Sequence, residues 1–163
     1  MSELIKHFED CRLESYKDSA GIWTIGYGST KNVKQGMKIT KEEADRLLDL
    51  DLYDAEMRVK KAIPDLFYTL TDNEKEAVIS LAYNLRSFEA LANHLKKDKE
   101  LFKRKMLLYC KDVAGNYLKG LKIRRIAERL LFEGRDWYAI TLELQDRKKT
   151  IEDIKRKEKE LFV

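Results

Sequence analysis

Residues 12–28 read RLESYKDSAGIWTIGYG, and this stretch decides the fold class. It gathers aromatic and β-branched residues with three glycines, a composition typical of strands and tight turns. We therefore expect a β-hairpin within residues 12–30, with its turn at Asp18-Ser19-Ala20-Gly21. Because side chains alternate along a strand, Thr24 would face away from the apolar side chains of the second strand. Those apolar side chains are Trp23, Ile25 and Tyr27.

The rest of the chain has the apolar spacing of helices. It holds one Pro and seven Gly among 163 residues, and apolar residues recur at intervals of three and four. Two capping boxes, Thr40 with Glu43 and Thr71 with Glu74, mark helix starts. We expect helices over 41–62, 71–85, 88–97, 98–112 and 121–133, with Pro64 ending the first, a loop at 114–116 and a stop at Gly134. The expected fold class is α+β, predominantly helical.

The C-terminal residues 137–161 have a heptad pattern. Apolar side chains occupy six of the eight seam positions, with Arg147 and Glu158 at the other two. The six are Trp137, Ile140, Leu144, Ile151, Ile154 and Leu161. The pattern predicts one long amphipathic helix. Either its apolar face packs on its own domain, or it mediates self-association or contact with a partner.

Composition excludes several classes of protein. Lys and Arg total 33 against 29 Asp and Glu, a net charge of +4, which suits polyanionic surfaces but is small for a dedicated nucleic-acid binder. Cys11 and Cys110 make no disulfide framework and are expected to be reduced and buried. His7 and His94 show no metal-ligand spacing, and nucleotide-binding loops are absent, so we expect no metal and no cofactor.

No stretch has 18 consecutive apolar residues. The chain does not begin with a basic patch followed by a hydrophobic run, the pattern of an export signal. We therefore expect that the protein is synthesised in the cytoplasm and does not insert into a membrane.

Three residues suited to hydrolysis, Glu9, Asp18 and Thr24, lie close together in sequence. Their spacing alone is not specific, because carboxylates are abundant. The surrounding residues are more specific: Leu4-Ile5-Lys6-His7-Phe8-Glu9 before the hairpin and Thr24-Ile25-Gly26-Tyr27-Gly28 within it. With Ala82-Tyr83-Asn84, Leu118-Lys119-Gly120-Leu121, Arg124-Arg125 and Ala127-Glu128, this context closely resembles the phage-type lysozymes over residues 4–133.

The resemblance implies a two-lobe fold and a reaction. A hairpin lobe at about 12–35 and the linking helix 41–62 would join a helical lobe at about 65–134, and residues 135–163 would add a terminal helix. The implied reaction is hydrolysis of the β-1,4 bond between N-acetylmuramic acid and N-acetylglucosamine in bacterial peptidoglycan. By analogy with endolysins, a separate protein would permeabilise the membrane first.

Glycoside hydrolysis needs an acid for the leaving oxygen and a carboxylate that handles water. Glu9, beside Phe8 and expected to be partly desolvated, would be the acid. Asp18, in a polar turn, would stay ionised and act as the base, while Thr24 holds the water. The resemblance favours inversion, with the carboxyl groups about 6.5–9.5 Å apart, whereas a separation near 5 Å would predict retention.

Four further residues are candidates for substrate binding: Gly28, Asn84, Arg124 and Arg125. Gly28 could let a sugar approach the backbone, or simply form a turn. Asn84 could bind saccharide or make an internal hydrogen bond. Either arginine could pair with Glu9 or contact substrate, and the alternative is an ion pair with Glu128 at the surface.

Some positions depart from the family pattern. Asp10 and Arg86 stand where Gly is common, and Ser29 stands where His is frequent. These departures keep open a second interpretation, a catalytically weak or silent peptidoglycan-binding protein on the same fold. The oligomeric state is expected to be monomeric, with self-association through 137–161 as the alternative.

Overall fold

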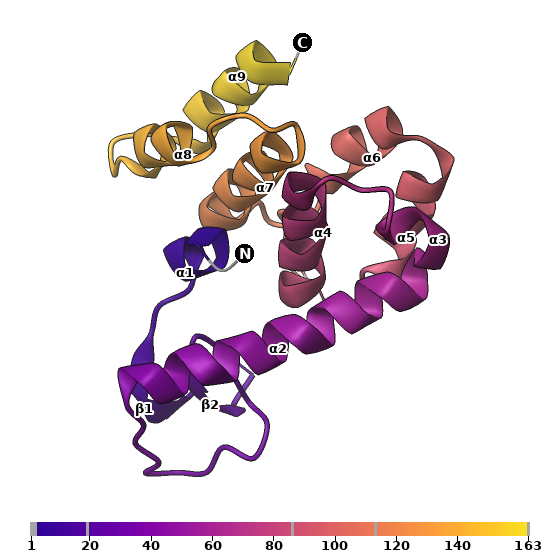
Figure 1. The fold of residues 1–163 in the computed structure, drawn as a ribbon. Coiled ribbons are helices and arrows are strands. Elements are labelled where there is room, and N and C mark those ends of the chain that lie inside the picture. Colours follow the sequence, from indigo (N-terminus) through magenta and orange to yellow (C-terminus); the bar gives the residue numbers. More distant parts are fainter. Residues whose placement is uncertain (1–2, 19, 86, 113, 163) are drawn as a thin grey trace. The chain divides into compact units, whose positions relative to one another are not determined.

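A computed structural model describes residues 3–18, 20–85, 87–112 and 114–162. The chain divides into two compact units, Met1–Arg58 and Val59–Val163. The first holds helix α1 (Glu3–Phe8), strands β1 (Arg12–Lys17) and β2 (Trp23–Gly26) and most of helix α2 (Lys41–Ala62). The second holds α3 (Pro64–Phe67), α4 (Asp72–Asn84), α5 (Glu89–Lys97), α6 (Lys99–Met106), α7 (Lys119–Phe132), α8 (Tyr138–Gln145) and α9 (Ile151–Phe162) (Figure 1). This confirms a predominantly helical α+β protein.

The predicted hairpin is present as a two-stranded antiparallel sheet. Tyr16 pairs with Thr24, and Lys17 pairs with Trp23. The register shifts between Arg12 and Tyr16, as a β-bulge does. Ser19 of the predicted turn lies outside the described residues, as does Arg86.

Strand β2 does not alternate between buried and exposed side chains as predicted. Thr24, Ile25 and Tyr27 are all buried, whereas Trp23 is half-buried. The reason is that α2 and the segment before it also cover the strand. A Cβ placed on Gly26 would lie 3.5 Å from the Cβ of Ala44 and 3.6 Å from the side chain of Ile39.

Helix α2 begins and ends where the sequence predicts. The Thr40 N–H donates to the Glu43 carboxylate at 2.8 Å, and the Glu43 N–H donates to the Thr40 hydroxyl at 3.2 Å, which completes the capping box. The helix ends at Ala62, before buried Ile63, and Pro64 then begins the short helix α3. Proline suits this first turn because the N–H groups there have no intrahelical acceptor, so the N–H that proline lacks is not needed.

Helix α7 is the most buried helix of the second unit. The side chains from Lys122 to Phe132 are all buried, and α4 and α8 pack against it. It ends at Phe132, and Gly134, two residues later, has a φ of 68°, which matches the predicted glycine stop. The Thr71–Glu74 capping box before α4 is likewise confirmed.

The helix predicted over 98–112 is too long. Helix α6 ends at Met106, and the chain continues in turns through buried Leu107 to buried Cys110. Cys110 is a free thiol, and burial raises its pKa. Cys11 is also free but only half-buried, which corrects the expectation that both thiols are buried.

The single long helix predicted for 137–161 is wrong, because the structure has α8 and α9 there. Asp146 follows α8, and its carboxylate accepts the Lys148 N–H at 2.9 Å. Thr150 then caps α9 through a reciprocal pair of bonds with Asp153. Leu144 and Ile154 are buried within the second unit, which favours packing of the apolar face on the chain's own domain.

Candidate active site

Backbone atoms of the hairpin turn hold the Asp18 carboxylate. Its Oδ1 atom accepts the N–H of Ala20 at 2.9 Å and the N–H of Ile22 at 2.8 Å. The Asp18 N–H donates in turn to the Ile22 carbonyl at 3.0 Å. Among the described residues, both bonds to this carboxylate end on Oδ1. Its Oδ2 atom is therefore able to accept a proton or a further hydrogen bond.

Thr24 is connected to the same peptide group. Its hydroxyl donates to the Ile22 carbonyl at 3.0 Å, and the side chain is only 3% exposed. The Ile22 carbonyl therefore accepts both the Asp18 N–H and the Thr24 hydroxyl. Because the Thr24 proton is used in this bond, its oxygen presents lone pairs as an acceptor.

Glu9 follows the last residue of α1. Its N–H donates to the Ile5 carbonyl at 2.9 Å, so the last turn of the helix fixes its backbone. Leu4 and Ile5, at 0% and 1% exposure, anchor this short helix. The Glu9 side chain is half-buried, between the extremes of core and bulk solvent. All three predicted catalytic residues lie in the unit Met1–Arg58.

Gly28 lies in a tight turn after β2. It is exposed, and its φ of 111° is a conformation that other residues rarely adopt. The next residue, Ser29, is 3% exposed and its hydroxyl donates to the carboxylate of Asp51 in α2. The turn that carries Gly28 is thus tied to the middle of α2.

Burial raises the pKa of Asp51, although the Ser29 hydroxyl works in the opposite direction. A raised pKa means that the folded protein binds this proton more tightly than the unfolded chain does. The contribution of Asp51 to stability is therefore fully present below its unfolded pKa and is lost as pH rises through its folded pKa.

We expect Asp51→Asn to remove this loss, because the amide oxygen can still accept the Ser29 hydroxyl without a buried charge. The melting temperature of the variant should rise relative to the parent between pH 4 and pH 7, as thermal unfolding at a series of pH values would show. Asp65→Asn, at an exposed position in α3, is the control. A difference from the parent that stays constant with pH would contradict the prediction.

The second unit brings Asn84, Arg124 and Arg125 together around Glu128. Arg125 Nε lies 2.7 Å from Glu128, and Arg124 Nε lies 3.2 Å from it. Arg125 also donates to the Asn84 amide oxygen at 3.0 Å. Ser80, which sequence reasoning missed, donates to Glu128 at 2.6 Å.

This cluster is internal rather than at the surface. Arg125 and Glu128 are both 0% exposed and Arg124 is 3% exposed. The predicted alternative of an ion pair with Glu128 is therefore correct in its partner, but the pair is buried and not at the surface. Asn84 likewise makes an internal hydrogen bond.

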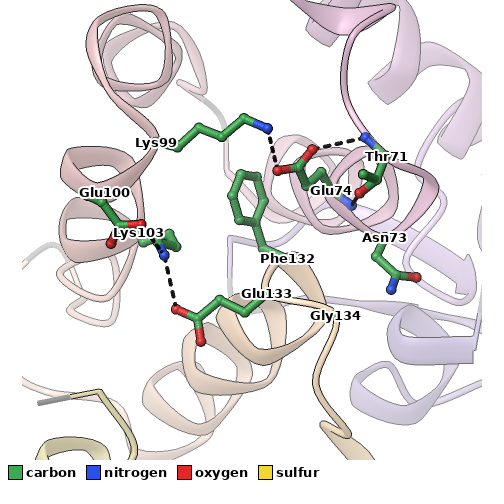
Figure 2. A pocket seen from close by; sticks show the side chains of 9 residues that line it. All are labelled: Thr71, Asn73, Glu74, Lys99, Glu100, Lys103, Phe132, Glu133 and Gly134. Atoms are coloured by element: carbon green, nitrogen blue, oxygen red, sulfur yellow. Dashed lines mark hydrogen bonds and ion pairs between the residues drawn. The ribbon is translucent and has the colours of Figure 1, made fainter.

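A separate pocket of about 520 Å³ lies in the second unit, at the start of α4, along α6 and at the end of α7 (Figure 2). Its charged side chains pair with one another: Lys99 with Glu74 at 2.5 Å, and Lys103 with Glu133 at 3.5 Å. Burial acts to raise the pKa of Glu74, but Lys99 and Thr71 outweigh it and hold the pKa below its usual range. None of the predicted catalytic or substrate-binding residues lines this pocket.

Comparison with known proteins identifies the family. The family model described as phage lysozyme matches residues 6–128. An endolysin of Acyrthosiphon pisum secondary endosymbiont phage 1 is 34% identical over 140 residues, which are 80% of this chain and 92% of the relative. The chain belongs to the phage lysozyme family, and it is a peptidoglycan hydrolase of the lysozyme type.

Solved structures show the same fold. An endolysin from Escherichia coli O157:H7 phage FAHEc1 is 36% identical, with a TM-score of 0.66 over 80% of this chain and 88% of that one. A P22 lysozyme mutant is 33% identical, with a TM-score of 0.65 over 80% and 92%. In the ranges that the structure describes, no helix has the length and apolar character needed to cross a membrane.

Proposed function

We propose that this chain cleaves the β-1,4 bond between N-acetylmuramic acid and N-acetylglucosamine in peptidoglycan, with Glu9, Asp18 and Thr24 as its catalytic residues. One observation carries the assignment: Asp18 and Thr24 are both hydrogen-bonded to backbone atoms of Ile22. This arrangement leaves a carboxylate oxygen and a hydroxyl oxygen as acceptors, and in the proposal one water molecule donates to both. Family membership supports the substrate class.

Glu9 is the proposed general acid. In this role its carboxylic proton passes to the glycosidic oxygen as the bond from that oxygen to the anomeric carbon breaks. Protonation lets the sugar leave as a neutral alcohol rather than as an alkoxide. Glu9 is half-buried where it follows α1, which restricts its contact with water.

Asp18 and Thr24 would activate the water. The water donates one proton to Thr24 Oγ1 and the other to Asp18 Oδ2, and its lone pair attacks the anomeric carbon. Asp18 then keeps the proton that the water loses as the new bond forms. Because backbone bonds fix the carboxylate and the hydroxyl beforehand, little reorganisation is needed at the moment of reaction. Attack by water on the face opposite the leaving group inverts the anomeric centre.

Gly28 is the remaining candidate for direct substrate contact. Its exposed backbone and missing side chain would let a sugar approach the turn after β2. Asn84, Arg124 and Arg125 instead have partners within the protein. We propose that these three residues stabilise the second unit rather than bind saccharide directly.

The alternative is a catalytically weak or silent peptidoglycan-binding protein. The substitutions relative to the family pattern, Asp10 and Ser29 among them, are the reason to test it. In the structure Ser29 donates a partly buried hydrogen bond to Asp51, which attaches the turn after β2 to α2.

Product analysis separates these functions. We expect purified peptidoglycan to release soluble muropeptides with N-acetylmuramic acid at the new reducing end. Proton nuclear magnetic resonance taken early in the reaction should show the α-anomer, as inversion of a β-linkage requires. Binding to peptidoglycan without release of muropeptides would support the silent alternative, and an initial β-anomer would show retention.

A further inference from the structure

A cluster of four polar side chains connects the two elements that carry Glu9 and Thr24 to the start of α2. The cluster comprises Lys6 of α1, Tyr27 after β2, and Lys41 and Asp45 of α2, and we call it the α2 cluster. We propose that Lys6 and Asp45 are positioning residues, which hold the end of α1 so that Glu9 meets its substrate in the right orientation. This inference rests on the proposed role of Glu9.

The ion pair between Lys6 and Asp45 attaches α1 to α2. Lys6 Nζ lies 2.8 Å from Asp45 Oδ1. Lys6 precedes Glu9 by three residues, so the two residues belong to the same helical turn. Because α1 has only six residues, a bond at its last turn has a direct effect on the residue that follows.

Tyr27 connects the hairpin to the same point. It is 4% exposed, and its hydroxyl accepts a hydrogen bond from Lys41 Nζ, which in turn lies 4.0 Å from Asp45 Oδ1. Tyr27 follows β2, the strand that contains Thr24. The carboxylate of Asp45 is therefore linked to α1 through Lys6, and to the hairpin through Lys41 and Tyr27.

The directions of the pKa shifts agree with these contacts. Hydrogen bonding by Lys6 holds the pKa of Asp45 below its usual range, despite the opposing effect of burial. The same bond raises the pKa of Lys6, and the bond to Tyr27 raises the pKa of Lys41. All these groups keep their charges at neutral pH. The Lys6 and Asp45 side chains remain 31% and 38% exposed, so they are not core residues.

A misplacement of about 1 Å can cost a catalytic group on the order of a hundredfold in rate. We therefore expect Lys6→Met and Asp45→Asn each to lower kcat by about tenfold with little change in KM, measured as muropeptide release against peptidoglycan concentration. Because they break one ion pair, the double variant should be no worse than either single variant. Lys6→Arg keeps the charge and should recover most of the rate.

The pH profile separates positioning from a simple electrostatic effect on Glu9. Lys6→Met removes a positive charge and Asp45→Asn removes a negative one, so an electrostatic effect would move the alkaline limb of kcat in opposite directions. Positioning lowers kcat in both variants and leaves that limb in place. Opposite shifts of the limb, or unchanged kcat in both variants, would overturn the proposal.

Two controls keep the outcome specific. Lys38→Met breaks an exposed ion pair with Glu14 in the same unit and should behave as the parent. Ile154→Val removes a buried methyl group in the second unit and tests whether lowered stability alone reduces kcat. If it reduces kcat as much as Lys6→Met at a matched loss of melting temperature, the positioning role is wrong. If the parent protein itself releases no muropeptides, the proposed hydrolytic function is wrong, and the positioning role falls with it.

Discussion

Glu9→Gln is expected to lower the rate of peptidoglycan hydrolysis by about 10²–10⁴-fold, the range that a general acid contributes. Gln has nearly the same size as Glu but has no acidic proton to donate to the leaving oxygen. The backbone bond from Glu9 to Ile5 does not involve the side chain, so the end of α1 should keep its structure. Loss of turbidity in a cell-wall suspension measures the rate.

Glu14→Gln is the matched control, because Glu14 is an exposed carboxylate on β1 in the same unit. It should lyse the suspension at the parent rate. Circular dichroism of both variants shows whether they fold. A folded Glu9→Gln protein that hydrolyses peptidoglycan as fast as the parent would mean that another group donates the proton.

Glu128→Gln is expected to cost about 3–5 kcal/mol of folding free energy, the usual effect of removing one partner of a buried ion pair. Without its negative charge, the guanidinium groups of Arg124 and Arg125 would remain buried beside each other uncompensated. For a chain of this length the melting temperature should fall by about 10 °C.

A surface pair in the same unit provides the comparison. Glu143 is 43% exposed and pairs with Lys157 at 3.1 Å. Exposed ion pairs contribute about 0–1 kcal/mol, so Glu143→Gln should hardly change the melting temperature. Equal small losses in the two variants would show that the buried cluster does not stabilise the second unit.

Local signals in the sequence predict much of the fold. The Thr40–Glu43 and Thr71–Glu74 capping boxes place two helix starts correctly, because the bonds involved span only three residues. Gly134 likewise marks the end of α7, since its positive φ depends on the residue itself. Signals of this kind need no knowledge of the tertiary structure.

The tail shows where a regular pattern misleads. Its heptad spacing resumes at Ile151 after the exception at Arg147, but between these positions Asp146 and Thr150 satisfy the backbone with their own side chains. Thr150 with Asp153 was a recognisable capping signal, with Asp in place of the more typical Glu. Helix propensity alone does not decide between one long helix and two shorter helices over residues 137–161, because the local hydrogen bonds of Asp146 and Thr150 make the difference.

The candidate site could be predicted in identity but only partly in geometry. Glu9, Asp18 and Thr24 follow from motif and chemistry, and the hairpin follows from composition. The bonds that both Asp18 and Thr24 make to Ile22 depend on the exact path of the turn. The assembly of Ser80, Asn84 and Arg125 around Glu128 joins residues more than 40 positions apart, and only packing brings these together.

The dependence on the Ile22 peptide also affects how this hairpin can evolve. Its N–H and carbonyl make the bonds, whereas its side chain is 43% exposed. Most other side chains can therefore replace that of Ile22 without disturbing its backbone hydrogen bonds. Proline is the exception, because it has no N–H to donate to Asp18. Selection at this position acts on the course of the main chain, which leaves the outer surface of the turn open to diversification.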